Sequence, residues 1–352
     1  MILFYSILTF FWAFFVALFA IPSIIQVAHK KQLLDIPSNR RLHITDTPRL
    51  GGLAIFAGFI SSLMLFGEIN QSIQKLIAST IIIFFIGLKD DMVSVSAFKK
   101  FFVQILAASI IVFLGDIRIA DFHGLFGIGE LPGGVGYFFT LIVVLGITNA
   151  FNLIDGLDGL AGTLAVLACV IYGAMFLFLG GAEYNPELLM CFCLAGSVLA
   201  FLRYNIYKAE IFMGDTGSLI CGFIIAFFAI KIISINQVAG INDTSMPIFA
   251  MAPIVLPVAD TLRVFAIRLF SGFSPFSPDN NHLHHRLSIL CIKPLMIVLL
   301  YCGYTILNVL VFINLDNNNP TILVLVMYTT IFLVMFVIEF LFNRKIKLNN
   351  CQ

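Results

Sequence analysis

Residues 137–162, with the sequence YFFTLIVVLGITNAFNLIDGLDGLAG, join a long apolar run to a cluster of amides and carboxylates. The apolar half is typical of a bilayer-spanning helix, which needs about 20 such residues. The second half contains Asn149, Asn152, Asp155 and Asp158. A carboxylate at the centre of a bilayer costs roughly 2.5 to 3.5 kcal/mol, so acids packed against a spanning segment predict a functional site.

The composition of the whole chain indicates a membrane protein. Of its 352 residues, 60% are hydrophobic and 11% are charged, and its mean hydropathy is +1.04. Soluble domains have about 25% charged residues. The net charge of +1 comes with no dense basic face that would drive binding to nucleic acid. We therefore expect an all-α, polytopic integral membrane protein, folded as one domain over residues 1–352, with no nucleic-acid partner.

Apolar runs of sufficient length predict about eleven transmembrane helices, centred near residues 14, 59, 80, 107, 143, 170, 195, 225, 258, 305 and 331. Lys and Arg favour cytoplasmic loops, and this bias sets the orientation. With the N-terminus outside, all but three of the 20 Lys and Arg residues fall on the cytoplasmic side, the exceptions being Lys75, Arg118 and Lys231. An odd number of spans then places the C-terminus in the cytoplasm.

Four polar motifs gather on this predicted cytoplasmic side. They are GLKDD, with Asp90 and Asp91; the cluster at 149–162; FMGDTGSL, with Asp215; and SPDNNHLHHRL, with His282, His284, His285 and Arg286. Taken singly, an acidic pair at a helix end is often a solvated boundary, and a histidine-rich loop is often only exposed. Together, five aspartates on one side would repel one another unless a cation or hydrogen-bond donors compensated them.

Oxygen ligands from Asp and Asn suit Mg²⁺, which binds through one or two carboxylates together with waters and substrate phosphates. A diphosphate substrate fits that arrangement, because the histidines and Arg286 could donate hydrogen bonds to its oxygens. Zinc is the competing metal for His282, His284 and His285. The motif has no Cys, however, and its HLHH spacing is not a usual tetrahedral set.

In this order and at these positions, the four motifs resemble the polyprenyl-phosphate N-acetylhexosamine-1-phosphate transferase family of integral membrane enzymes, over roughly residues 40–290. The resemblance implies transfer of a sugar 1-phosphate from a UDP-sugar to a polyprenyl phosphate, with release of UMP. It also implies a requirement for Mg²⁺, for which Mn²⁺ could substitute. The eleven spans and the cytoplasmic active face are similar to the branch that uses UDP-N-acetylglucosamine.

The resemblance also implies roles for individual residues. Asp215 matches the family's Mg²⁺-binding aspartate, and Asn152 matches an asparagine near the metal and the diphosphate. Asp90 and Asp91 match the acidic pair at the acceptor phosphate, one of which has been proposed as a general base. A phosphate monoester, with a second pKa of about 6, is already largely ionised at neutral pH. We therefore assign the pair first to positioning and charge control and second to base catalysis.

The remaining matches concern the substrates. Asp155 and Asp158 match residues that line the nucleotide pocket, and Asn205 and Phe212 match positions near the uracil, where an aromatic ring can stack. Phe212 could equally be an ordinary membrane phenylalanine, because the chain has 38 of them. The histidines match a diphosphate-binding element. Lys100 matches a basic residue near the acceptor phosphate, although a positive-inside anchor would look the same.

Two features bear on the sugar. The last motif reads HLHH where the muramoyl-pentapeptide branch typically has three consecutive histidines, and the chain has an additional final helix. The segment RRLHITDTPRLGG, with His43, Arg49, Gly51 and Gly52, also resembles the N-acetylglucosamine branch, or is simply a basic loop before a helix. We therefore expect a UDP-N-acetylhexosamine and undecaprenyl phosphate as substrates, in the inner membrane of a bacterium.

Other classes of function stay open from the residues alone. A secondary transporter or cation channel could use Asp90, Asp155 and Asp215 to relay protons or bind cations, but such proteins place charges near the midplane, on paired broken helices. A non-enzymatic binder of polyprenyl phosphate would not need the complete set of motifs. An outer apolar helix could pair with a second copy or face lipid, so a homodimer also stays open.

Overall fold

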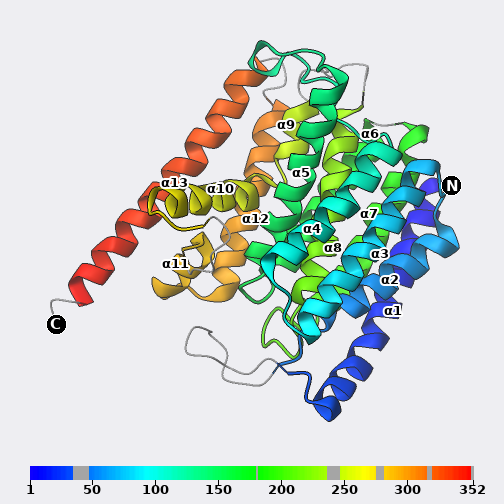
Figure 1. The fold of residues 1–352 in the computed structure, drawn as a ribbon, viewed down its shortest axis with the longest axis horizontal. Coiled ribbons are helices and arrows are strands. Elements are labelled where there is room, and N and C mark those ends of the chain that lie inside the picture. Colours follow the sequence, from blue (N-terminus) through cyan, green and yellow to red (C-terminus); the bar gives the residue numbers. More distant parts are fainter. Residues whose placement is uncertain (35–46, 180, 236–245, 275–280, 315–318, 350–352) are drawn as a thin grey trace.

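The structure is a computed structural model, and it describes residues 1–34, 47–179, 181–235, 246–274, 281–314 and 319–349. Within these ranges the chain is helical, with one isolated bridge between Asp121 and Glu130 and no strand. The long helices run side by side in one bundle (Figure 1). α1 and α13 run in the same direction, so the two ends of the chain lie at opposite ends of the bundle. Which end faces the cytoplasm stays a prediction.

Nine helical segments in the described part of the chain are long and apolar enough to cross a membrane, which confirms an all-helical, multi-pass membrane protein. The segments contain α1 (Ile2–Lys31), α3 (Gln71–Met92), α4 (Ala97–Ser109, continued to Leu114), α5 (Gly133–Ile154), α6 (Leu160–Phe178), α7 (Asn185–Leu202), α8 (Gly214–Ile233), α12 (Pro294–Asn314) and α13 (Pro320–Asn349). The count of eleven stays a prediction. α2 (Gly51–Phe66) has only 16 residues, and the run expected near residue 258 forms two short helices.

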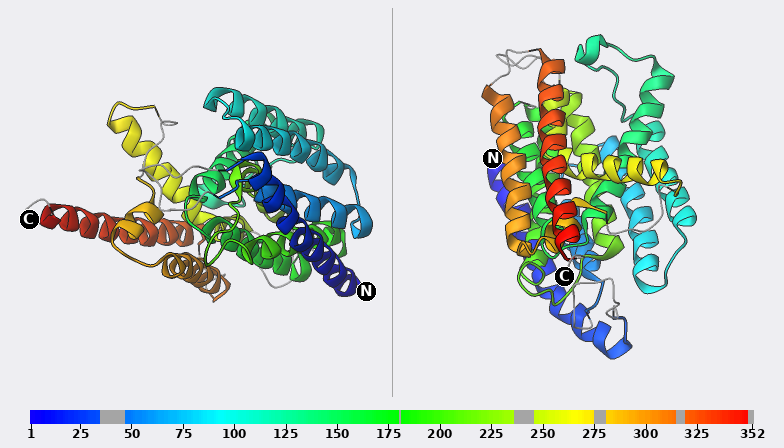
Figure 2. Two further views of the ribbon diagram at one scale, coloured as in Figure 1. Left: turned by 90° about the horizontal axis from the view of Figure 1, so that it is seen from below. Right: turned by 90° about the vertical axis from the view of Figure 1, so that its left-hand side faces the viewer.

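That run is divided by a turn. α9 (Met246–Met251) ends before residues 252–254, and α10 (Val255–Phe270) then lies across the direction of the neighbouring helices (Figures 1 and 2). Pro253 in the turn has no backbone N–H with which to continue a helix. α10 also contains Asp260 and Arg263, and charged side chains are costly in a bilayer unless they are paired. The run therefore forms a short helix followed by a transverse one.

α8 is buried along almost its whole length, between α2, α3, α5 and α6. Glycines allow these helices to approach closely, as is common between membrane helices. A Cβ added to Gly87 of α3 would lie 2.6 Å from the Cα of Thr216, and one on Gly222 of α8 would lie 2.9 Å from the Cα of Thr148 on α5. The end of α3, the end of α5 and the start of α8 are therefore held together at one end of the bundle.

Candidate active site

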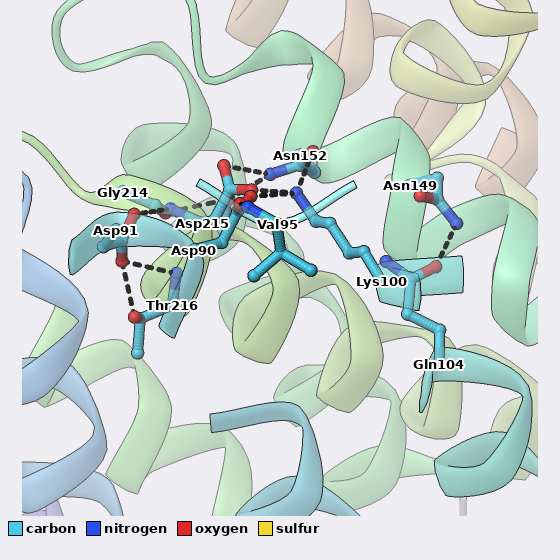
Figure 3. Close-up of polar contacts among 11 residues, drawn as sticks. Asp90, Asp91, Val95, Lys100, Gln104, Asn149, Asn152, Gly214, Asp215 and Thr216 are labelled. Atoms are coloured by element: carbon cyan, nitrogen blue, oxygen red, sulfur yellow. Dashed lines mark hydrogen bonds and ion pairs between the residues drawn. The ribbon is translucent and has the colours of Figure 1, made fainter. Parts of the chain in front are cut away.

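Asp91, the second acid of GLKDD, is bonded to the start of α8. Its Oδ1 accepts a hydrogen bond from the backbone N–H of Asp215 at 2.7 Å. Its Oδ2 accepts from the backbone N–H of Thr216 at 2.9 Å and from the Thr216 hydroxyl at 2.5 Å. The first N–H groups of a helix have no partner inside that helix, so Asp91 supplies one from α3. It thereby fixes the turn that carries Asp215 (Figure 3).

Asp90 instead faces a group of polar side chains around the Lys100 ammonium (Figure 3). The Nζ of Lys100 lies 3.3 Å from the Oδ2 of Asp90 and 3.5 Å from the Oδ1 of Asn152. It also forms a short ion pair with Asp215. The Nδ2 of Asn152 donates to the Oδ1 of Asp215 at 3.0 Å. Oxygens from α3, α5 and α8 therefore converge on one positive charge supplied by α4.

This arrangement fits a divalent cation. Carboxylate and amide oxygens are the ligands that Mg²⁺ takes, and it usually completes its shell with water and substrate phosphates. The two expected ligands, Asp215 and Asn152, are in direct contact, and the ammonium of Lys100 shows that a positive charge is accommodated beside them. Among the described residues, no group of three or more His, Cys, Asp or Glu side chains could hold a metal ion. A metal here would therefore depend on substrate and water for much of its coordination.

A second amide pair lies one helical turn farther along the same two helices. Gln104, four residues after Lys100 on α4, is buried, and its Oε1 accepts a hydrogen bond from the Nδ2 of Asn149 at 2.7 Å. Asn149 stands one turn before Asn152 on α5. Sequence analysis did not identify Gln104, although its four-residue spacing from Lys100 places both on one face of a helix. The pair joins α4 to α5 below the charged group.

The segment before α2 is bonded to the turn before α8. The N–H of Phe212 donates to the carbonyl oxygen of Pro48 at 2.8 Å. In return, the N–H groups of Gly51 and Gly52 donate to the carbonyl oxygens of Phe212 and Met213, each at 2.9 Å. Both glycines are buried and leave no room for a Cβ. Gly51 and Gly52, in the segment that resembles the N-acetylglucosamine branch, therefore allow the two backbones to pack closely. His43, in the same segment, lies outside the described residues.

The loop after α5 carries two acidic residues, Asp155 and Asp158, near this segment. Burial raises the pKa of Asp155 well above its ordinary value, and the negative charges of Asp91 and Asp158 raise it further. The positive charge of Arg49 opposes the shift. Asp155 thus lies within electrostatic range of Asp91 at the end of α3 and of Asp158 on its own loop. The contact of Asp155 and Asp158 with a nucleotide stays a prediction.

Asn205 has both ends of its amide engaged within the protein. Its Oδ1 accepts a hydrogen bond from the N–H of Gly159 at 2.7 Å, and its Nδ2 donates to the carbonyl oxygen of Ile211 at 2.9 Å. The side chain is buried. It therefore holds the DGLDG loop (residues 155–159) against Ile211, which directly precedes the FMGD motif (residues 212–215). A contact of Asn205 with the uracil stays a prediction, as does stacking by the half-buried Phe212.

The histidine motif forms the short helix α11 (Leu283–Ile289), with His282 as its N-cap. The ring of His284 lies 5.8 Å from that of His282 and 4.2 Å from that of His285, measured between centroids. A Cβ added to Gly156 would lie 2.7 Å from the Nε2 of His284. α11 therefore rests on the DGLDG loop. Burial lowers the pKa of His284 to about 3, so its imidazole is neutral at physiological pH.

Arg286 faces the C-terminal helix. Its guanidinium forms an ion pair with Glu339 of α13 and lies 5.0 Å from the centre of the Phe342 ring. The sequence predicts that this arginine donates hydrogen bonds to a diphosphate. The structure gives it a partner within the protein, which was not foreseeable because Glu339 lies in a predicted spanning helix far along the chain. Phosphate binding by Arg286 stays a prediction.

Asp260, on α10, is a fully buried acid that sequence analysis did not single out. Its Oδ1 accepts from the Nη2 of Arg263 at 2.9 Å, and its Oδ2 lies 3.0 Å from the Nδ1 of His282. The backbone N–H of Leu283 also donates to this carboxylate, at 3.1 Å. Burial alone would raise the pKa of Asp260, but the hydrogen bond and charge of His282, together with Arg263, hold it below its ordinary value. Asp260 therefore anchors the start of α11.

The glycosyl transferase family 4 profile matches residues 73–233, the range that contains Asp90, Asn152 and Asp215. The decaprenyl-phosphate N-acetylglucosaminephosphotransferase of Mycobacterium tuberculosis is 34% identical over 291 residues, which cover 76% of this chain and 72% of that protein. The probable undecaprenyl-phosphate N-acetylglucosaminyl 1-phosphate transferase of Bacillus subtilis is 34% identical over 281 residues, covering 78% of this chain and 76% of that protein. The chain belongs to glycosyl transferase family 4.

A further relative of this glycosyl transferase is the undecaprenyl-phosphate alpha-N-acetylglucosaminyl 1-phosphate transferase of Escherichia coli K12. It is 30% identical over 268 residues, covering 74% of this chain and 70% of that protein. The family that the four motifs resembled is thereby confirmed. In this glycosyl transferase, Asp260, the histidine helix and α13 lie beyond the range matched by the family profile.

Proposed function

We propose that this glycosyl transferase transfers N-acetylglucosamine 1-phosphate from UDP-N-acetylglucosamine to undecaprenyl phosphate, releasing UMP and beginning a lipid-linked cell-envelope glycan. The observation that carries the proposal is the convergence of Asp90, Asn152 and Asp215 around Lys100 at the ends of four helices. The names of the relatives give the same sugar and the same class of lipid. We place the reaction at the cytoplasmic face of a bacterial inner membrane, on the charge distribution of the loops.

The reaction is a phosphoryl transfer. An oxygen of the lipid phosphate forms a bond to the sugar-linked phosphorus, and the bond from that phosphorus to the bridging oxygen breaks as UMP leaves with the electron pair. Catalysis of such a step consists mostly of positioning and electrostatic stabilisation. Mg²⁺ held by Asp215 and Asn152 would neutralise charge on the diphosphate. Lys100 would place a second positive charge beside the same phosphates.

The two acids of GLKDD take different parts in this proposal. Asp91 already accepts three hydrogen bonds from the start of α8, so we assign it to keeping Asp215 in place. Asp90 lies beside the Lys100 ammonium and would set the charge next to the attacking phosphate. A general base is not required, because the acceptor phosphate is largely ionised at neutral pH.

The donor end of the site would lie where the DGLDG loop meets α11. The neutral imidazole of His284 is buried, and neither of its ring nitrogens has a hydrogen-bond partner among the described residues. Buried polar atoms normally have partners, so a substrate oxygen or hydroxyl fits here. Asp155 and Asp158, on the loop beneath, would face the nucleotide.

The competing classes are less well supported. A transporter would place its ionisable groups near the middle of the membrane, whereas the carboxylates here stand at the end of α3 and the start of α8. Acids at helix ends suit an acceptor whose head group lies at the membrane surface. A non-enzymatic lipid binder would have no need of the nucleotide side of the site, and it is separated from a transferase by the assay below.

The deciding experiment is a reconstituted reaction. Purified protein in detergent is incubated with Mg²⁺, undecaprenyl phosphate and, one at a time, UDP-N-acetylglucosamine, other UDP-N-acetylhexosamines and UDP-muramoyl-pentapeptide. UMP release and the lipid diphosphate product are both measured, with reactions lacking lipid as controls. UMP and product from UDP-N-acetylglucosamine support the proposal. If product forms only from another donor, the donor sugar assigned here is wrong. If no donor gives UMP, the proposed transferase activity is refuted.

A further inference from the structure

The C-terminal helix contacts the histidine helix through three side chains on one face. Glu339, Phe342 and Lys345 follow one another at intervals of three residues, so they lie close together on the surface of α13. Glu339 and Phe342 contact Arg286 from two sides, as an ion pair and as a ring beneath the guanidinium. Lys345 donates to the carbonyl oxygen of Ile289, the last residue of α11, at 2.8 Å. α13 therefore holds α11 at its middle and at its end.

Glu339 also reaches the start of α11 through a chain of charged contacts. Its Oε2 lies 3.5 Å from the Nη1 of Arg263. Arg263 donates to Asp260, and Asp260 in turn bonds to His282 and to the backbone of Leu283. The carboxylate of Glu339 is one-third exposed, while Arg263 and Asp260 are increasingly buried. Glu339 is thus the outer member of a series that ends at the first histidine.

These contacts matter because α11 cannot hold its own position. It has seven residues, and isolated helices shorter than about 12 residues are marginal in water. Its orientation over the DGLDG loop, where His284 lies against Gly156, must come from tertiary contacts. The contacts described above come from α10 and α13.

We propose that Glu339 is a positioning residue of this transferase: from the last helix it braces Arg286 and Arg263, which hold the histidine helix against the DGLDG loop. Arg286 then acts as a strut between α11 and α13. The proposal rests on the proposed function, since it takes the loop and the histidine helix as the binding surface for the nucleotide sugar.

Glu339→Gln tests the proposal because it removes the charge and keeps the size of the side chain. The KM for the UDP-sugar should rise by roughly three- to tenfold, the size expected for the net contribution of one ordinary hydrogen bond. The KM for undecaprenyl phosphate should stay unchanged, because the acids near Lys100 are held by other contacts. A merely structural defect would lower the fraction of active protein, and hence the maximal rate, without changing either KM.

A double-mutant cycle with Arg286→Gln shows whether the two residues act through one contact. We expect Arg286→Gln to raise the same KM, and the double variant to be no worse than the more affected single one. If Arg286 bound the diphosphate directly, Arg286→Gln would have a large effect while Glu339→Gln left the KM at the wild-type value. That result would overturn the positioning role.

Glu187→Gln is the matched control. It makes the same chemical change in an ion pair with Lys231, at 3.3 Å, at the opposite end of the bundle, and it should leave both KM values unchanged. Should Glu339→Gln fail to fold, Lys345→Gln removes the bond to Ile289 and should raise the same KM. If a folded Glu339 or Lys345 variant has an unchanged KM for the UDP-sugar and the wild type is active, the positioning role is overturned and the proposed function is not. Wild-type protein that releases no UMP overturns the proposed function and this inference together.

Discussion

Asp91→Asn should reduce stability more than Asp90→Asn, although the two residues are adjacent and the chemical change is the same. The carboxylate of Asp91 accepts two backbone N–H bonds and one hydroxyl bond from Asp215 and Thr216. An asparagine has a single acceptor oxygen, so its NH₂ group would face at least one of these donors. An unsatisfied donor costs about 1–3 kcal/mol when buried. Because Asp91 is half-buried, we expect a loss of about 1–2 kcal/mol in the free energy of unfolding.

Asp90→Asn removes less. The Oδ1 of Asp90 accepts one backbone bond, from Val95 at 2.5 Å, which an asparagine oxygen can keep. Its pair with Lys100 is mostly buried, but the Lys100 ammonium keeps its ion pair with Asp215 when Asp90 is neutralised, so no charge is left unpaired. We expect a loss below about 1 kcal/mol, together with a fall in turnover, because the charge beside Lys100 changes.

Both free energies can be measured by unfolding the purified variants with SDS in mixed micelles, followed by circular dichroism. UMP release in the folded state is measured on the same preparations. The reasoning would be refuted by an Asp91→Asn variant that unfolds within about 0.5 kcal/mol of the wild type, the range of substitutions without structural consequence. It would be refuted equally by an Asp90→Asn variant that is the less stable of the two.

Three further predictions concern the metal, the turn before Asp215 and the histidine helix. Asp215→Ala should abolish UMP release at every Mg²⁺ concentration, and EDTA should stop the wild type reversibly; ordinary activity in the variant would reject the metal assignment. Gly214→Ala should give little folded, active protein, because Gly214 has a φ of 70° and an added Cβ would lie 2.2 Å from the carbonyl oxygen of Arg49. Gly303→Ala is the control, because a Cβ added there meets nothing within 4 Å, and its melting temperature should equal or exceed that of the wild type. Equal melting temperatures for the Gly214 and Gly303 variants would contradict the packing argument. His284 has a pKa of about 3 when folded against 6.5 ordinarily, so the unfolded chain takes up the proton first and stability falls as the pH drops from about 6.5 towards 3. Between pH 7.5 and pH 5.5 this amounts to about 1.4 kcal/mol, measured by SDS unfolding, and an equal loss in His284→Gln would count against it.

The positions of the helices were largely predictable, because an apolar run of bilayer length has few alternatives to a helix. The exception is the run around residue 258. Its average hydropathy resembles a span, but the break depends on Pro253 and on where Asp260 and Arg263 find partners. Those partners come from residues later in the chain, His282 and Leu283 among them. Such long-range contacts cannot be predicted from the local sequence. The role of Asp260 in anchoring α11 was therefore not predicted either.

The gathering of Asp90, Lys100, Asn152 and Asp215 was predictable from topology, since alternate helix ends share one face of the membrane. The division of labour between Asp90 and Asp91 was not. Successive residues on a helix project about 100° apart, so one of two adjacent acids faces α4 and the other faces α8. Deciding which is which requires the rotation of α3 about its axis, and that rotation follows from packing contacts such as Gly87 against Thr216.

The bond from Asp91 to the start of α8 also sets an order of events during biogenesis. Asp91 and Asp215 are 124 residues apart in sequence, and Lys100 and Asp215 are 115 apart. Chains fold from the N-terminus as they are synthesised, so α3 and α4 enter the membrane well before α8 has been made. Until then Asp91 lacks its partners on α8 and is best accommodated at the water-facing surface, whereas Asp90 already has Lys100 and Val95 as partners. A nascent chain that stalls before residue 214 would therefore display the Asp91 carboxylate without its three hydrogen-bond donors.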